Sequence, residues 1–211
     1  MRDMDVLAEH RSNIYGLLSI VYIKEPTDEF IKSLREPSIL NTFKELGLNI
    51  GEGFQNVGDG KLLEDLVLEY TRLFIGPGKH ISTYESVWCD QDGSLWGKST
   101  SEVKRFIESS GLEYHADWTG LPDHVGVELE FMQKMIKAEA LAWEKEDKEM
   151  AMSLLQYEQK FMDEHIYKWI PPFCKKVAEE ATLSFYKEIA DLTGSFIEFD
   201  KKEISRLLKE K

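Results

Sequence analysis

Apolar residues recur every three or four positions along most of this 211-residue chain. Between Asp123 and about Lys145, for example, the apolar residues Val125, Leu129, Met132 and Ile136 follow one another at that spacing. The spacing places them on one face of a helix. The sequence holds no series of the short alternating segments that are typical of β-strands. We therefore predict an all-α protein.

Start and stop residues divide this pattern into separate helices. We expect helices at about 3–23, within 25–36, and at about 37–46, 61–74, 99–111, 123–145, 147–171, 173–192 and from 200 onward. The predicted N-caps are Thr27, Ser99 (in a capping box with Glu102), Asp147 and Asp200, and the predicted ends include Gly111, Pro171-Pro172 and Gly194. The predicted buried face of the first helix carries Val6, His10, Ile14, Leu17 and Val21. Roughly eight to nine helices indicate one single-domain bundle that covers residues 1–211.

One long segment without helical periodicity, from about Ile75 to Lys98, interrupts the bundle. The helix before it ends at Gly76-Pro77-Gly78, because glycine tolerates a left-handed cap and proline cannot continue a helix. Loops of this length are usually functional or disordered. This one carries Tyr84, Trp88 and Trp96, an aromatic content that is not typical of disorder. We therefore expect an ordered loop that serves as a binding surface.

The chain is acidic, since 39 Asp and Glu against 26 Lys and Arg give a formal net charge of −13. Nucleic-acid-binding proteins normally carry a basic excess, so the balance argues against such a partner. Cys89 and Cys174 form no C-x-x-C pair and suggest a reducing compartment. The first residues do not resemble a secretory signal, and the longest apolar stretch among them is too short to cross a membrane. We expect a cytoplasmic protein without a membrane span.

Sequence motifs of catalysis and metal binding are missing. No histidine is followed by glutamate and none has glutamate three residues before it, so neither H-E-x-x-H nor Glu-x-x-His occurs. Gly76-Pro77-Gly78-Lys79 lacks the upstream glycine of a phosphate-binding loop, and Asn56 stands where a dinucleotide motif after Gly51-Glu52-Gly53 needs glycine. We expect no enzymatic activity, no metal and no cofactor.

The strongest polar group in the sequence is Asp123-His124, with Glu128 about one turn later. Asp123 can be explained as a helix cap, because its charge suits the positive end of the helix dipole. His124 needs another explanation, since a cap requires no histidine beside it. The pair could hold a cationic or hydrogen-bonding ligand. The alternative is a small hydrolase or nucleotide-binding protein that uses Asp123-His124, although no nucleophile accompanies the pair.

Three stretches carry a resemblance to a known family: YTRLFIGPG (Tyr70–Gly78), YESVW (Tyr84–Trp88) and LPDHVGVELEFM (Leu121–Met132). Together with the order and length of the helices, they resemble the TorD/DmsD/NarJ family of cytoplasmic chaperones for the maturation of molybdenum-containing oxidoreductases. Many members read Glu-Pro-x-Asp-His, whereas here Leu121 precedes Pro122 and the spacer residue is missing. This chain is closer to the nitrate-reductase branch in that respect.

The resemblance implies an all-helical fold without catalytic turnover. It implies binding of the twin-arginine signal peptide and catalytic subunit of a molybdenum oxidoreductase of the DMSO, TMAO or nitrate reductase kind. The protein would hold this client until its molybdopterin cofactor is inserted. By position, the resemblance assigns partner-binding roles to Tyr70, Leu73, Phe74, Tyr84, Trp88, Asp123 and His124. It leaves open which oxidoreductase is the client and whether the protein forms a homodimer.

The residue types supply a physical reason for such a partner. Twin-arginine signals are basic at the front and apolar behind, so a groove of carboxylates and aromatic rings complements both parts. We expect the end of the Lys61–Phe74 helix, the Tyr84–Trp88 loop and the Asp123-His124 corner to converge into one groove. Glu85 is expected at its rim, as a charge for the arginines.

Overall fold

The computed structural model describes residues 2–37, 39–40, 56–111 and 119–209. Within these residues the fold is all-helical, as predicted, and contains no strand. The contacts group into two compact units that alternate along the chain. Unit 1 consists of residues 1–23, 83–171 and 196–211, and unit 2 consists of residues 24–82 and 172–195. Most of the helix predicted at 37–46 lies outside the described residues.

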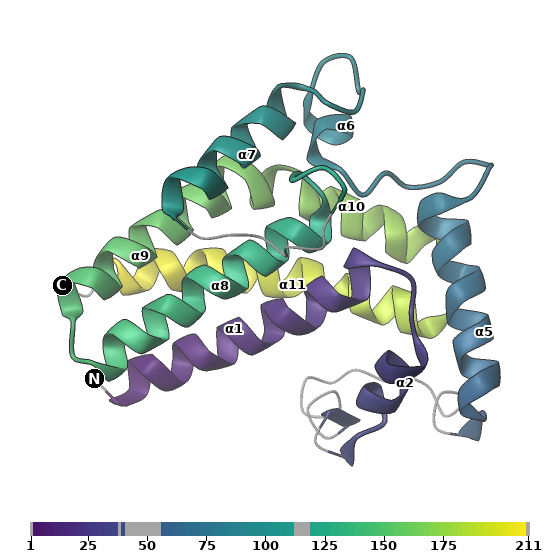
Figure 1. Ribbon diagram of the computed structural model, residues 1–211, viewed down its shortest axis with the longest axis horizontal. Coiled ribbons are helices and arrows are strands. Elements are labelled where there is room, and N and C mark those ends of the chain that lie inside the picture. Colours follow the sequence, from purple (N-terminus) through teal and green to yellow (C-terminus); the bar gives the residue numbers. More distant parts are fainter. Residues whose placement is uncertain (1, 38, 41–55, 112–118, 210–211) are drawn as a thin grey trace. The chain divides into compact units, whose positions relative to one another are not determined.

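Unit 1 is built on the packing of α1 (Arg2–Ile23) along α8 (Val125–Glu144), which lie side by side in Figure 1. Helix α9 (Lys148–Phe161) also packs on α8, and the π-helical turn η2 (Met162–Ile166) leads from α9 into α10 (Tyr167–Glu180). The short helix α6 (Glu85–Cys89) packs on α7 (Lys98–Ser110). No helix in the described part of the chain is both long enough and apolar enough to cross a membrane.

Helix α1 has the predicted extent but a different buried face. The buried side chains include Ala8, Arg11, Tyr15, Leu18 and Tyr22. On the predicted face, Val6 is 46% exposed and His10 is also exposed, whereas Val21 is buried as predicted. The prediction rested on apolar residues alone, whereas a charged residue, Arg11, occupies the centre of the buried stripe.

Arg11 joins four helices of unit 1. Its guanidinium donates to Glu139 on α8 (2.8 Å), to Glu158 on α9 (2.7 Å) and to Asp200 on α11, Ser184–Leu207 (2.5 Å). The hydroxyl of Tyr15 also donates to Asp200 (2.8 Å). Burial raises the pKa of Glu139 and of Glu158, although the charge of Arg11 opposes this. The cluster therefore combines one guanidinium with three carboxyl groups, some of which retain protons more readily than usual.

At the start of two helices in unit 1, the backbone N–H groups are capped by residues other than the predicted ones. Ser99 lies inside α7, and its N–H (3.1 Å) and Oγ (2.7 Å) donate to the carboxylate of Asp90. The N-cap of α8 is His124 instead of Asp123, since Nδ1 of His124 accepts the N–H of Gly126 (3.1 Å). The predicted end of α7 at Gly111 and the predicted N-cap of α9 at Asp147 are both confirmed.

Unit 2 contains α2 (Asp28–Leu34), packed on α5 (Asp59–Tyr70). Thr27 caps α2 as predicted, because its Oγ1 accepts the N–H of Phe30 (3.3 Å). Helix α5 continues into the π-turn η1 (Thr71–Ile75) before Gly76 ends it. Gly76 has a φ of −55°, so the predicted left-handed cap is wrong.

The last two helices break at a different place from the predicted one. Helix α10 continues through Pro171-Pro172, and α11 continues through Gly194 and Asp200. The two prolines lack the N–H groups that would donate to the carbonyls of Tyr167 and Lys168 four residues earlier, and the helix continues without these two hydrogen bonds. The predicted breaks at the two prolines and at Gly194 are therefore wrong, and so is the N-cap at Asp200.

The break between α10 and α11 lies at residues 181–183 and is stabilised by a carboxylate from α5. Glu69 accepts the N–H of Thr182 (2.6 Å) and that of Leu183 (3.3 Å). Arg72 donates to the same carboxylate (2.8 Å). Although burial opposes the shift, these hydrogen bonds lower the pKa of Glu69 to about 2. Glu69 thus performs the capping role at the start of α11.

Gly126 allows α1 and α8 to approach closely. A Cβ at this position would lie 2.8 Å from both Cα and Cβ of Ile23. We expect Gly126→Ala to lower the free energy of unfolding by about 1–3 kcal/mol through this overlap. Gly60→Ala in α5 is the matched control, since nothing lies within 4 Å of a Cβ there, and alanine should stabilise that helix by up to about 1 kcal/mol. Urea denaturation measures both changes, and equal effects would contradict the packing argument.

Candidate functional site

The segment predicted as a loop at 75–98 includes α6, and it is attached to the start of α8. The N–H of Glu85 donates to the carbonyl of Asp123 (2.9 Å). Tyr84 and His124 form an isolated antiparallel bridge, and their rings meet edge to face with centroids 5.1 Å apart. The structure therefore brings the YESVW and PDH segments of the sequence together.

Asp123 and His124 are buried, with 0% and 4% of their surface exposed. Oδ2 of Asp123 accepts the N–H of Ser86 (3.0 Å), so this carboxylate caps α6. His124 uses Nδ1 to accept from Gly126, and burial lowers the pKa of its ring to about 3. A neutral imidazole with Nδ1 occupied in this way is not a general base oriented by a carboxylate. The geometry gives the hydrolytic alternative no support, and the pair instead fastens α6 to α8.

A buried polar cluster that was not predicted lies next to α6. Glu85 is 2% exposed, instead of standing at a rim, and its Oε2 lies 3.0 Å from Nδ1 of His165 in η2. Glu128 accepts the Nε1–H of Trp169 (3.0 Å), and the charge of Glu85 acts on its carboxyl group. Burial, and then the charge of Glu85, raise the pKa of Glu128 well above its usual range. Both effects favour the protonated form of Glu128.

A cavity of about 770 Å³ opens beside α6. Its charged lining consists of Glu85, Asp90, Asp92, Glu102, Lys98 and Lys168. The carboxylates of Asp90 and Asp92 accept hydrogen bonds from neutral donors, the hydroxyl groups of Ser99 and Ser94 (2.7 Å each). Four carboxylates against two cations make this cavity suited to a cationic ligand.

Cys89 also lines this cavity and is not in a disulfide; the residue is exposed, but its sulfur is partly buried. Burial of the sulfur, and then the charge of Glu85, raise the pKa of Cys89 to about 11. A thiol with a raised pKa is a weak nucleophile at neutral pH. Among the described residues, no group of three His, Cys, Asp or Glu side chains is arranged to hold a metal ion.

Two exposed apolar residues directly precede Gly97, which lines the same cavity. Leu95 is 48% and Trp96 is 78% exposed. Trp96 has a φ of 66°, in the left-handed region that costs a residue with a side chain about 1–3 kcal/mol. Strained backbone and an exposed aromatic side chain are typical of binding sites. The sequence shows Trp96 in the loop, but neither its exposure nor its φ can be read from the pattern.

The predicted residues Tyr70, Leu73 and Phe74 belong to unit 2 and are buried there. The ring of Phe74 packs on that of Phe173, with centroids 6.0 Å apart. Leu73 lines a small cavity of about 120 Å³ whose charged lining is mostly basic. The convergence of these residues with the α6 segment concerns both units and stays a prediction.

An all-helical fold with a carboxylate-rich cavity and an exposed tryptophan is that of a helical binding protein. Residues 38–175 match the family described as nitrate reductase delta subunit. The chain belongs to this family of TorD/NarJ-like redox-enzyme maturation chaperones, as the resemblance predicted.

Curated relatives match along the full chain. "Chaperone protein TorD" of Vibrio cholerae serotype O1 (strain M66-2) is 24% identical, over 100% of this chain and 99% of its own. The protein of the same name from Photobacterium profundum is 25% identical, over 95% and 96%. A crystal structure from Archaeoglobus fulgidus, described as a redox enzyme maturation protein, has a TM-score of 0.57 at 22% identity and covers 89% of this chain and 93% of its own. That structure supports the fold, and the two relatives are chaperones, not enzymes.

Proposed function

We propose that this protein is a cytoplasmic chaperone that binds the twin-arginine signal peptide of a molybdenum oxidoreductase subunit. It holds the subunit until the molybdopterin cofactor is inserted. The observation that carries the proposal is the carboxylate-rich cavity beside α6, next to the exposed Leu95 and Trp96. Membership of the nitrate reductase delta subunit family supports a role in redox-enzyme maturation.

The cavity and the tryptophan suit the two parts of such a peptide. The carboxylates of Asp90 and Asp92 can accept the planar N–H fork of an arginine in addition to their present neutral donors. The apolar stretch that follows the arginines can pack on Leu95 and Trp96. The net charge of −13 also attracts a basic peptide over a longer distance.

The predicted site residues take two kinds of role in this proposal. Tyr84 and Trp88 are half-buried and can contact the peptide beside α6. Asp123 and His124 are positioning residues that hold the α6 segment on α8. Glu85 lines the cavity from within the buried cluster. For the residues in unit 2, a role in binding the client rests on the resemblance alone.

Calorimetric titration with a twin-arginine peptide, at low and high salt, tests the proposal. Trp96→Ala is expected to weaken binding about thirtyfold, because loss of an aromatic anchor costs about 2 kcal/mol. Asp92→Asn should weaken it less, and this loss should shrink at high salt, since an exposed charge is screened. Leu141→Ala is the control, because Leu141 is 46% exposed on α8 but does not line the cavity. Wild-type protein that fails to bind millimolar peptide would refute the proposal.

A further inference from the structure

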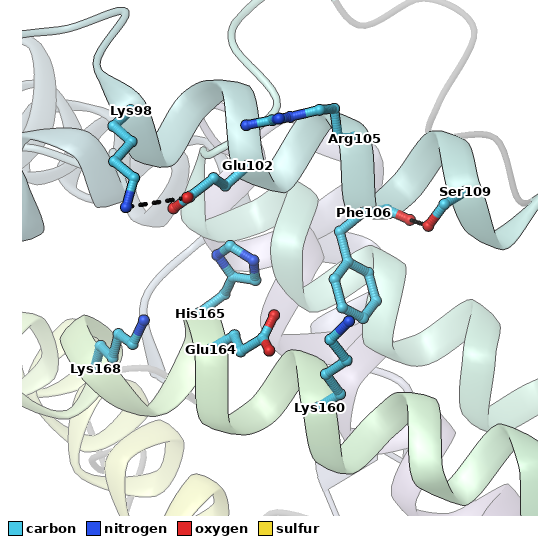
Figure 2. Close-up of a pocket in the computed structure, with 9 residues that line it drawn as sticks. All are labelled: Lys98, Glu102, Arg105, Phe106, Ser109, Lys160, Glu164, His165 and Lys168. Atoms are coloured by element: carbon cyan, nitrogen blue, oxygen red, sulfur yellow. Dashed lines mark hydrogen bonds and ion pairs between the residues drawn. The ribbon is translucent and has the colours of Figure 1, made fainter.

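A second cavity, of about 600 Å³, adjoins the acidic one. Lys98, Glu102 and Lys168 line both cavities. Figure 2 shows the second cavity between α7, which carries Lys98 and Glu102, and the stretch from α9 through η2 into α10. Since three side chains are common to them, the two cavities form one continuous surface, which we name the α7 cleft.

The two halves of the α7 cleft carry opposite charge. Apart from the shared residues, the charged lining of the first half consists of Glu85, Asp90 and Asp92. That of the second half consists of Arg105, Lys160 and Glu164. In a chain with a net charge of −13, cations gathered at one end of a cleft form a distinct electrostatic feature.

The cations of the basic half are open to a carboxylate ligand. Nε of Arg105 donates to the carbonyl of Ser101 (3.1 Å), and Nζ of Lys160 lies 5.5 Å from the centroid of the Phe106 ring. These contacts are with a neutral carbonyl and an aromatic ring, and both side chains are exposed. His165 also lines this cavity (Figure 2), but it is 3% exposed and its Nδ1 lies 3.0 Å from Glu85, so the ligand would meet mainly the two cations.

We propose that the basic half of the α7 cleft binds an acidic segment of the same client polypeptide whose arginines occupy the acidic half. This inference rests on the proposed function. Continuity with the acidic half favours a polypeptide over a separate small anion, because one extended chain can lie along both halves. The protein then recognises a pattern of basic and acidic residues in the client instead of positive charge alone.

The geometry of α7 sets the spacing of that pattern. The second cavity extends along α7 from Lys98 to Ser109, roughly 16 Å at a rise of 1.5 Å per residue. An extended peptide covers this length with about five residues. The acidic residues of the client are therefore expected within about five residues of the point where it leaves the acidic half.

Fluorescence anisotropy with two labelled peptides tests the inference. One peptide carries the twin arginines and two aspartates about five residues away, and the other has asparagines in place of the aspartates. Each is made in both chain orders. Wild-type protein is expected to bind the aspartate peptide about fivefold more tightly at low salt in one of the two orders, because each exposed ion pair contributes little. The double variant Arg105→Gln/Lys160→Gln is expected to lose this preference.

The matched control is Lys137→Gln/Lys145→Gln, which removes two exposed cations that do not line the cleft and should keep the preference. Equal affinity of wild-type protein for both peptides, in both orders, would overturn the inference and leave the proposed function standing. A preference that persists in Arg105→Gln/Lys160→Gln would also overturn it. If neither peptide binds, the proposed function itself fails.

Discussion

Arg11→Met is expected to lower the free energy of unfolding by about 3–5 kcal/mol, because it leaves a buried group of carboxylates without a counter-charge. Arg11 is the only cation that the described contacts of this cluster include, and the side chains of Glu139, Glu158 and Asp200 are at most 1% exposed. Methionine fills a similar volume but donates no hydrogen bond. Chemical denaturation at neutral pH measures the loss, which should shrink at pH 5, where the carboxyl groups take up protons more easily.

Arg206→Met is the matched control for Arg11→Met. Arg206 pairs with Glu203 three positions earlier on the same helix, and its side chain is 48% exposed. An exposed pair of this kind contributes at most about 1 kcal/mol. A loss of similar size in both variants would show that the buried cluster does not depend on its guanidinium.

Glu128→Gln is expected to stabilise the protein above about pH 5, by an amount that grows by up to about 1.4 kcal/mol per pH unit. Burial, and then the charge of Glu85, keep Glu128 protonated in the native state above its ordinary pKa of 4.5, whereas the unfolded chain releases that proton. The native state then binds more protons than the unfolded state, so wild-type stability falls as pH rises toward the native pKa. Glutamine cannot ionise, and its amide oxygen can still accept the Nε1–H of Trp169.

Chemical denaturation at pH 5, 6 and 7 measures the free energy of unfolding of wild type and of Glu128→Gln. The difference between the two proteins is then compared across the three pH values. Glu203→Gln is the control, because hydrogen bonding to Arg206 lowers the pKa of Glu203. The carboxyl group of Glu203 is ionised in both the native and the unfolded state over this pH range. The difference in free energy of unfolding between Glu203→Gln and wild type should therefore stay constant. A constant difference for Glu128→Gln as well would mean that the native state does not hold the extra proton.

The features that were predicted correctly depend on residues close together in the sequence. Thr27 and Asp147 cap the helices that they directly precede, and Gly111 ends α7 with a φ of 71°. The extent of α1 and the all-helical class follow from apolar spacing in the same way. Each of these requires only a local backbone geometry, which a short stretch of sequence determines.

The errors arise where a residue distant in the sequence determines a helix end or a buried face. At a helix end, such a residue accepts the hydrogen bonds of the free backbone N–H groups. Asp90 takes the place of the expected capping box at the start of α7, and Glu69 stabilises the start of α11. In α1, Arg11 is buried because three other helices supply its carboxylates. Apolar spacing gives no sign of these contacts, so most of the predicted face of α1, apart from Val21, and several predicted boundaries were wrong.

The candidate site was predicted in part. The sequence singled out the YESVW and PDH segments, which the structure places against each other. It did not indicate the cavity, the buried Glu85–Glu128–His165 group or the exposure of Trp96. His165 lies in the π-turn η2, and Leu73 and Phe74 lie in η1. A π-turn shifts the side chains that follow it around the helix, and helical spacing alone gives no sign of it.

The contact between Arg11 and Asp200 has a consequence for synthesis on the ribosome. The two residues lie 189 positions apart, so Arg11 is made roughly 10–40 s before its partner at ordinary rates of translation. During that time the inner face of α1 lacks α11, and unit 1 cannot be completed. Unit 2 ends at residue 195, before Asp200 is made. A chain that ends before Asp200 and has been released from the ribosome should therefore protect unit 2 from proteases while α1 remains open to cleavage.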